Sequence, residues 1–246
     1  MMPRTSESRR KTCVVAKPQI ISADDYFGCL AAALNNLPHA RVDEISERLL
    51  RAYEDERRIF LFGNGGSASL ASHFACDLAK GTALPGNHRR RFRAIALTDS
   101  VPMMTAWAND SSYEDIFAEQ LYNFIEPGDL AFAISASGNS PNVLKALEVA
   151  GGRHAFRIGL TGFQGGKIKS LCDLCLVVPS DNMQVIEDLH LSVAHALFTS
   201  IRHKIENGLV NTNGGSAGSG EPYYLPKPEL ASQTLLPALA KKAHSR

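Results

Sequence analysis

Two spacings of hydrophobic residues divide this chain into predicted helices and strands. Apolar residues that recur at helical spacing predict two helices before any strand, over residues 23–36 and 41–56. Unbroken apolar runs predict five short strands, at residues 59–62, 92–97, 130–134, 157–160 and 174–178. Further helices are expected at residues 67–80, 103–108, 114–124, 141–150 and about 182–205. Hydrophobic strands that alternate with helices indicate an α/β fold, with a parallel sheet covered on both faces.

The composition changes at both ends of this pattern. Residues 1–20 are polar, basic and aperiodic, so we expect a mobile tail there. Residues 21–206 hold all the predicted elements and form the predicted domain. Gly, Ser and Asn dominate residues 211–220, which predicts that 207–246 is a flexible linker followed by a C-terminal tail.

A glycine-rich turn follows the first predicted strand and has the features of an anion site. Its sequence is Gly63-Asn64-Gly65-Gly66-Ser67, and Ser67 is the expected N-cap of the next helix. Glycine lets a ligand approach the backbone N–H groups, and a helix N-terminus favours negative charge. Within that helix, His73 and Asp77 are four residues apart, so both leave the same face. An anion site beside a His/carboxylate pair indicates chemistry on a phosphorylated small molecule.

A serine-rich loop, Ser135-Ala136-Ser137-Gly138-Asn139-Ser140, follows the third predicted strand. Right-handed crossovers bring it to the same sheet edge as the glycine turn, where ligands bind in such sheets. Three hydroxyls at a helix start can surround a phosphate without a lysine. An ordinary polar turn is the alternative, since serine is a common N-cap, but the number of serines favours anion binding. Neither turn has P-loop or dinucleotide-motif spacing, which disfavours a nucleotide ligand.

The last predicted helix carries further ionisable residues. On helical geometry Asp188 and His195 point nearly the same way, and Glu187 can converge with His195 on one point. With His73 and Asp77 these residues make a plausible set for zinc or another divalent ion. A polar or inter-subunit helix with structural histidines accounts for the same pattern, and the sequence alone leaves both interpretations open.

Composition limits the partners and the compartment. The 246 residues carry a net charge of +1, which gives no argument for nucleic acid or a membrane as the main partner. No apolar run approaches the ~20 residues of a membrane span. Five cysteines without a short secreted framework suggest a reducing cytoplasm. Cys172 and Cys175 have the spacing of a redox or zinc half-site, but without a second pair they favour two buried thiols.

Together these motifs resemble the SIS (sugar isomerase) domain family, and within it the phosphoheptose isomerase branch. The resemblance runs from about residue 24 to 205, and it rests on residues 63–67, His73-Phe74-Ala75, Ala108-Asn109-Asp110, residues 134–140, residues 160–167 and the helix with Glu187 to His190 and His195. It implies a three-layer α/β/α sandwich with a five-stranded parallel sheet, and a homotetramer with active sites at subunit interfaces. It also implies interconversion of sedoheptulose 7-phosphate and D-glycero-D-manno-heptose 7-phosphate, which feeds surface-polysaccharide heptose.

The resemblance further implies roles for single residues. Ser135, Ser137 and Ser140 would hold the phosphate, while Asn64 and Ser67 would bind the sugar. The other implied substrate contacts are Gly65, Gly66, Asp99, Ala136, Gln184 and Glu187. A zinc site is implied at His73, Asp77, Glu187 and His195, with Asp77 as catalytic base and His195 as partner acid.

Two positions depart from the family pattern, which commonly has Glu at the position of Asp77 and Gln at that of Glu187. Aspartate is one methylene shorter, which moves a base by about 1 Å, enough to affect catalysis. The extra negative charge of Glu187 would tighten a metal site but would repel an enediolate.

The expected reaction is proton transfer between adjacent carbons, in which Asp77 takes the C1 or C2 proton and an enediol(ate) forms. One alternative is a non-catalytic SIS protein that binds the replication initiator DnaA. That branch tends to lack the acid and the histidine found here at Asp77 and His195, so their presence favours an enzyme. A sugar-phosphate sensor is the other alternative, although its usual helix-turn-helix domain is not evident in the tails.

Overall fold

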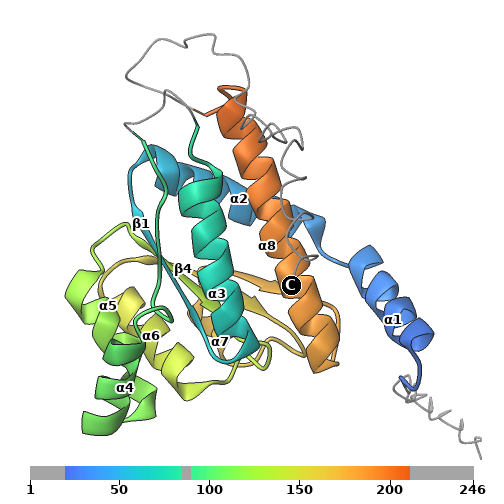
Figure 1. Ribbon diagram of the computed structural model, residues 1–246, viewed down its shortest axis with the longest axis horizontal. Helices are drawn as coiled ribbons and strands as arrows, with labels where there is room; N and C mark the ends of the chain where they lie inside the picture. The colour runs from blue at the N-terminus through green and yellow to red at the C-terminus, as the bar shows by residue number, and fades with distance from the viewer. Residues whose placement is uncertain (1–19, 85–89, 211–246) are drawn as a thin grey trace, which may run out of the picture.

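The computed structural model describes residues 20–84 and 90–210, so the predicted tails lie almost wholly outside the described residues. Its centre is a five-stranded sheet in the order β2-β1-β3-β4-β5 (Figure 1). The strands are β1 (Arg58–Gly63), β2 (Arg93–Ala96), β3 (Leu130–Ile134), β4 (Phe156–Thr161) and β5 (Leu174–Val177). Every pairing is parallel, which confirms the predicted sheet.

The helices also follow the predicted order, with ends shifted by a few residues. They are α1 (Ala23–Asn35), α2 (His39–Glu54), α3 (Gly66–Cys76), α4 (Val101–Asp110), α5 (Ala118–Phe124), α6 (Pro141–Gly152), α7 (Ile168–Leu171) and α8 (Met183–Glu206). One predicted helix, 114–124, is interrupted. Its first part is a short 3-10 turn, η2 (Tyr113–Asp115), whose start is capped by the Ser112 hydroxyl.

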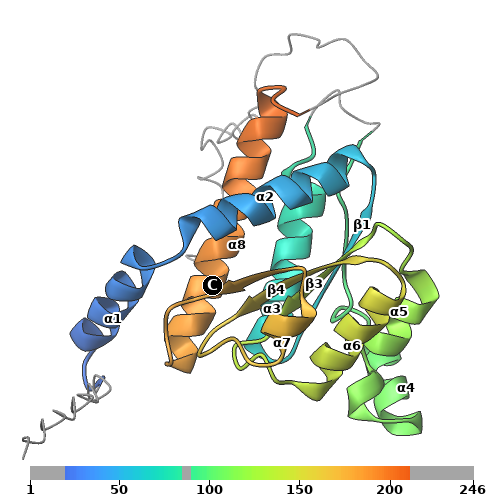
Figure 2. The same ribbon diagram turned by 180° about the vertical axis from the view of Figure 1, so that it is seen from behind.

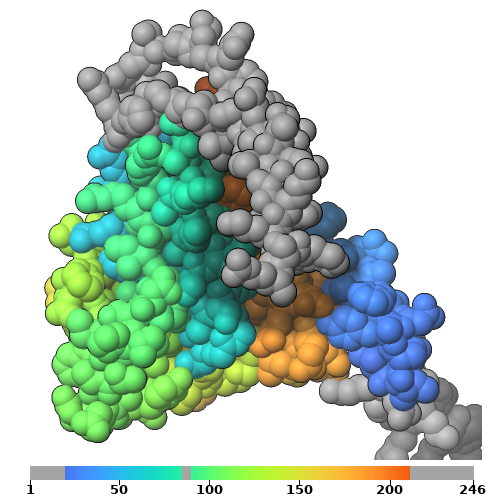
Figure 3. Space-filling view, viewed as in Figure 1, coloured from blue at the N-terminus to red at the C-terminus, as the bar shows by residue number. Residues whose placement is uncertain are grey.

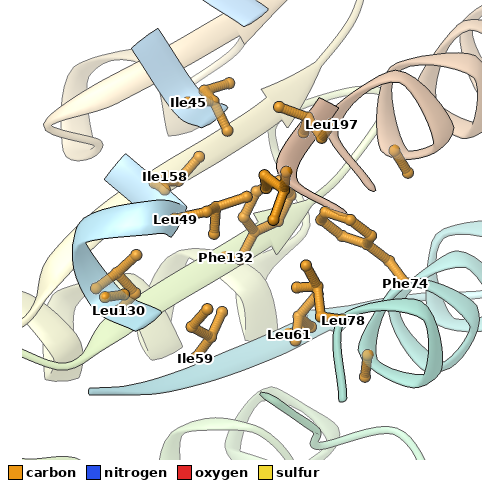
Figure 4. Close-up of a cluster of buried hydrophobic side chains, with 14 of the residues drawn as sticks. Ile45, Leu49, Ile59, Leu61, Phe74, Leu78, Leu130, Phe132, Ile158 and Leu197 are labelled. Atoms are coloured by element: carbon orange, nitrogen blue, oxygen red, sulfur yellow. The ribbon is translucent and has the colours of Figure 1, made fainter. Parts of the chain in front are cut away.

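Each face of the sheet has its own hydrophobic core, which makes the three-layer sandwich. Ile59 and Leu61 face the side of α2, α3 and α8, whereas Phe60 and Phe62 face α5 and α6. Figure 4 shows the first core, where Ile45, Leu49, Phe74 and Leu197 surround Phe132 of β3. Because the side chains of neighbouring β1 residues pack into opposite cores, the centre of the strand has no polar residue.

The strand order reverses between β1 and β3, and the candidate site is expected at this reversal. β1 pairs with β2 on one side and with β3 on the other, so the chain first moves outward and then returns across β1. Ligands of open parallel sheets bind at such a reversal, beyond the carboxyl ends of the strands. The glycine turn after β1 and the serine loop after β3 are both found there, because Gly63 is the register partner of Ile134.

The start of α3 differs from its prediction. Gly65, with φ 54°, is the N-cap, so the expectation that Ser67 caps the helix is wrong. Ser67 is instead buried in the first turn, where its N–H donates to the Asn64 carbonyl at 3.0 Å. A Cβ on Gly63 would lie 2.5 Å from the carbonyl oxygen of Ile134, and 2.7 Å from Cβ of Ser67. Glycine therefore lets the helix begin this close to two strands.

The N-terminal helix α1 reaches out from the body of the molecule beside the first half of α8 (Figure 2). Its contact is fixed by the Tyr26 hydroxyl, which donates to Asp188 Oδ2 at 2.5 Å. Burial at this contact and the neighbouring Asp188 carboxylate raise the pKa of Tyr26 to about 12. The outer face of α1 stays open, since Phe27 is 64% exposed.

Candidate active site

Two histidines and a carboxylate meet where α3 packs against α8. His73 Nε2 lies 2.9 Å from His195 Nε2 and 3.4 Å from Asp77 Oδ2. Both histidines are exposed and Asp77 is half-buried. Figures 1 and 3 show why they meet: α3 and α8 run side by side in the same direction, and their first turns are neighbours on the surface. The structure thus brings together three of the four predicted metal ligands.

Asp77 stands at a change of helix type. α3 ends at Cys76, and residues Asp77–Gly81 continue as a π-helical segment, η1. Single π turns inside helices occur often at functional sites, because they alter the direction of side chains at the break. At the end of this segment, a Cβ on Gly81 would lie 2.5 Å from the ring of Phe198. The helix predicted for 67–80 is therefore present, but from Asp77 onward it is π-helical rather than α-helical.

The three side chains fit a divalent metal ion. Tetrahedral zinc with ligand bonds of ~2.0–2.1 Å holds neighbouring ligand atoms about 3.3 Å apart. The observed 2.9 Å and 3.4 Å separations lie on either side of that value, and all three ligand atoms lie within 4.8 Å of one another. Two imidazoles and a carboxylate are a donor set that zinc prefers. Such a set leaves a fourth position free.

Glu187, the fourth expected ligand, does not lie in this cluster. Its carboxylate rests against the start of α3, since a Cβ on Gly66 would be 2.8 Å from Glu187 Oε1. A negative group at a helix N-terminus is electrostatically favourable. Glu187 and His195 are eight residues apart in one helix, a rise of about 12 Å, so they can share an ion only if both side chains extend toward each other. A ligand role for Glu187 stays a prediction.

The serine loop holds the three hydroxyls that are predicted to bind the phosphate, and that role stays a prediction. The hydroxyls of Ser135 and Ser140 face each other at 3.3 Å, and either can donate. Ser137 lies between them in the loop, and its Oγ accepts the N–H of Asn139 at 3.3 Å. The Ala136 carbonyl is held by the next loop, accepting the N–H of Gly162 at 2.9 Å. Hydroxyls that only bond each other can turn toward an anion that enters the loop.

A backbone contact between two loops fixes the serine loop. A Cβ on Gly138, where φ is 65°, would lie 2.2 Å from the carbonyl oxygen of Gly165. The N–H of Ile168 donates to the Gly138 carbonyl at 3.0 Å, and the N–H of Lys167 to Asn139 Oδ1 at 3.1 Å. The loop after β3 is thus built onto the loop after β4.

The other predicted substrate contacts lie around the same edge. Asp99 follows β2 and accepts a short hydrogen bond from the hydroxyl of Ser72, the residue before His73. Gln184 is exposed in the first turn of α8, where its N–H donates to Asn182 Oδ1 at 3.0 Å. Asn64 leaves the glycine turn and bonds Asn142 through its side-chain amide.

Comparison with known proteins agrees with this geometry. A sequence model described as the SIS domain matches residues 25–162. The phosphoheptose isomerase of Trichlorobacter lovleyi is 40% identical over 158 residues, which cover 64% of this chain and 79% of that protein. The Helicobacter hepaticus enzyme of the same name is 38% identical over 173 residues, 70% of this chain and 86% of that protein. The chain belongs to the SIS domain family, in its phosphoheptose isomerase branch.

Structural comparison agrees with this assignment. The phosphoheptose isomerase structure from Neisseria gonorrhoeae superposes with a TM-score of 0.67 and 30% identity, covering 73% of this chain and 96% of that chain. The predicted α/β/α sandwich of this family is therefore confirmed. The SIS sequence match ends before α8, so Glu187 and His195 lie beyond it. No helix among the described residues is long and apolar enough to cross a membrane.

The sequence analysis did not identify three residues that contact predicted site residues of this SIS domain: Ser72, Tyr113 and Asn142. Ser72 precedes a predicted ligand, and Asn142 lies two residues after the serine loop. Asn142 is only 2% exposed, although an amide in the first turn of a helix normally faces solvent. Their partners come from distant segments, so no local pattern identifies them.

The cysteine pair behaves as two partly buried thiols. Burial raises the pKa of Cys172 above its usual range, and the neighbouring Cys175 adds to this shift. Burial likewise raises the pKa of Cys175 to about 11. Thiols in this state are poor nucleophiles at neutral pH, and the chemistry of this family member lies elsewhere.

Proposed function

We propose that the protein is a phosphoheptose isomerase that interconverts sedoheptulose 7-phosphate and D-glycero-D-manno-heptose 7-phosphate. One observation carries the proposal: His73 and Asp77, which meet His195, lie along α3 and its π-helical continuation, and α3 begins in the glycine turn beside the serine loop. A phosphate held by that loop would leave the carbonyl end of the sugar to reach acid and base groups. Relatives with this name, about 40% identical, support the same reaction.

Asp77 would act as the base and His195 as the acid. In the ketose-to-aldose direction, Asp77 removes a proton from C1 while His195 gives a proton to the oxygen on C2, which yields the enediol. The hydroxyl on C1 then loses its proton, and a proton is added at C2 to complete the aldose. Proton transfer by positioned groups contributes about 10²–10⁴-fold to such reactions.

His73, Asp77 and His195 would hold zinc or a similar divalent ion. The ion would supply positive charge where the substrate oxygens become negative. An imidazole that binds an ion through Nε2 cannot deliver a proton from that atom, so the acid role and the ligand role of His195 exclude each other. The metal content of the active protein therefore decides which role His195 has.

The same residues weigh against the alternatives. Asp77 and His195 are the positions that the DnaA-binding branch tends to lack, and here they lie together beside His73. A protein that only senses a sugar phosphate needs the phosphate site but has no need for a base next to it. We also propose the homotetramer with interface sites; the open face of α1 supports an assembly. A cytoplasmic location stays a prediction.

The test is direct incubation with sedoheptulose 7-phosphate, with NMR detection of the aldose. Three samples are compared: the purified protein, the protein after chelation, and the chelated protein with zinc restored. Elemental analysis of the first sample gives the metal content. Aldose formation is expected in the first and third samples. If none of the three forms aldose while all bind the ketose, the protein is a binding protein and the proposed activity is wrong.

A further inference from the structure

Asn142 is buried behind the glycine turn and forms a closed pair with Asn64. Its Nδ2 donates to Asn64 Oδ1 at 2.8 Å, and Asn64 Nδ2 donates back to Asn142 Oδ1 at 2.9 Å. The N–H of Val143 also donates to Asn142 Oδ1 at 3.0 Å. Because a backbone N–H can only donate, this third bond fixes which end of the Asn142 amide is oxygen. The orientation of the Asn64 amide follows from it.

The amide oxygen of Asn64 accepts a second hydrogen bond. The hydroxyl of Tyr113 donates to Asn64 Oδ1 at 3.1 Å. Tyr113 belongs to η2, which is anchored by the buried Asp115: its carboxylate accepts the hydroxyls of Ser111 and Ser112 and pairs with Lys145 of α6. Tyr113 itself is 61% exposed.

The hydrogen-bonding capacity of Asn64 is then almost used up. Its amide oxygen has two lone pairs, and Asn142 and Tyr113 occupy both. Its amide nitrogen has two N–H groups, and Asn142 takes one. A single N–H is left for a ligand. Asn64 can therefore donate to a substrate oxygen, a hydroxyl or a carbonyl, but it cannot accept from a substrate hydroxyl.

We propose that Asn142 is a positioning residue of the isomerase: it aims the free Nδ2–H of Asn64 at an oxygen of the sugar. This rests on the proposed function, because Asn64 is there the residue that binds the sugar. The same pair joins the loop after β1 to the helix that follows the serine loop, across the reversal of strand order. Asn142 thereby links the sugar contact to the phosphate contact.

A double-mutant cycle with Asn64→Ala and Asn142→Ala tests the proposal through kcat/KM for sedoheptulose 7-phosphate. A donor aimed at a reacting or binding oxygen contributes about 10²-fold in favourable cases. We expect each single variant to lose at least tenfold, and the double variant to lose no more than Asn64→Ala alone. Tyr113→Phe should lose less, because Tyr113 is exposed and the Asn142 bonds remain. Independent losses that multiply in the double variant would overturn the proposal.

Gln120→Ala is the matched control. Gln120 is a second buried amide on the same side of the sheet, and its Nε2 donates to the carbonyls of Leu97 and Ile116 rather than to Asn64. It should lower the melting temperature and leave kcat/KM within twofold. If Asn142→Ala behaves in the same way, its role is only structural.

A crystal structure of the ligand-free Asn142→Ala protein separates this proposal from the proposed function. The Asn64 side chain is expected in a different rotamer, whether or not the protein turns over this sugar. An unchanged Asn64 amide would contradict the positioning role. A wild-type protein without isomerase activity would contradict the proposed function, and the structure of the variant would still decide the role of Asn142.

Discussion

The amino edge of the sheet and the cluster between α3 and α8 both contain ionisable groups, but the two regions use them differently. At the amino edge, the buried Asp129 accepts the N–H of Arg58 at 2.9 Å, its Nε at 3.0 Å and the N–H of Glu126 at 2.9 Å. In the cluster between α3 and α8, two imidazole nitrogens face each other beside a carboxylate. Opposite charges that pair with one another stabilise the fold. Groups of the same kind that converge without such pairing indicate a binding site for a ligand or an ion.

A second pair at the amino edge shows the same principle. The Asp173 carboxylate accepts from the N–H, Nε and Nη2 of Arg157, at 2.8, 3.2 and 2.9 Å. The hydrogen bond from the Arg157 side chain lowers the pKa of Asp173 and raises that of Arg157. The pair joins the starts of β4 and β5, away from the predicted site residues, so we assign it to stability.

Replacing the carboxylate of the α3–α8 cluster should affect the reaction and spare the fold. Asp77→Asn removes the base and keeps the shape of the side chain, so kcat should fall by about 10²–10⁴-fold. His195→Ala should lose a comparable factor. The measurement is turnover by NMR together with thermal unfolding of each variant. Asp188→Asn, a carboxylate of α8 outside the cluster, is the control that should retain activity. An Asp77→Asn protein with full activity would remove the proposed base.

Replacing a carboxylate at the amino edge should have the opposite effect. Asp129→Ala leaves Arg58 and two backbone N–H groups without their buried acceptor, which should lower the free energy of unfolding by about 3 kcal/mol. Urea unfolding gives this value, and kcat should stay within twofold of wild type. Asp173→Ala, from a more exposed pair, should lose no more than about 1 kcal/mol. A large loss of kcat in stable, folded Asp129→Ala protein would contradict the distinction between the amino edge and the cluster.

Two histidines of α8 show the same contrast between the candidate site and the interior of the fold. They allow a test in which the expected effect is smaller and depends on pH. His195 is exposed, whereas His190 is 1% exposed, and its Nε2 has no partner among the described residues. Burial lowers the pKa of His190 to about 4, against a backbone hydrogen bond with Thr161 that opposes the shift. The unfolded chain therefore binds a proton between about pH 6.5 and 4 that the folded chain does not.

Stability should consequently fall as the pH drops through this range. From pH 7.5 to pH 5, His190 alone should lower the free energy of unfolding by about 2 kcal/mol, because protonation favours the unfolded state. Urea unfolding at both pH values checks this, with His190→Gln as the comparison. The variant should have a weaker dependence on pH than wild type. Equal slopes in the two proteins would show that His190 is not the group responsible.

Much of the fold was predictable because its signals are local. The apolar run at residues 59–62 predicts β1 from adjacent residues alone, and the serines of residues 135–140 mark the loop after β3 in the same way. Both segments are found where they were predicted. The cap of α3 was misplaced because Gly65 adopts a positive φ that a pattern of polar residues does not reveal. The π-helical turn that begins at Asp77 contacts α8, a partner distant in sequence, and the pattern of the helix alone does not reveal it.

The sequence predicted which residues belong to the candidate cluster better than it predicted how they are arranged in space. His73, Asp77 and His195 were identified by residue type and helical spacing, and they do meet. The place of Glu187 depends on the alignment of α8 with α3, in which Glu187 lies against Gly66 and His195 against His73. That alignment is set by contacts between residues more than a hundred positions apart. Angles around a helix axis do not include the rise along it, which separates Glu187 from His195 by about 12 Å.

The contact between Gly138 and Gly165 has a consequence for binding kinetics. The serine loop is built onto its neighbour through backbone atoms, so its shape does not depend on the presence of a phosphate. A loop that is already ordered loses little conformational entropy when a ligand enters. Phosphate capture should then be a single fast step whose rate rises in proportion to ligand concentration, without a slower phase of loop ordering behind it.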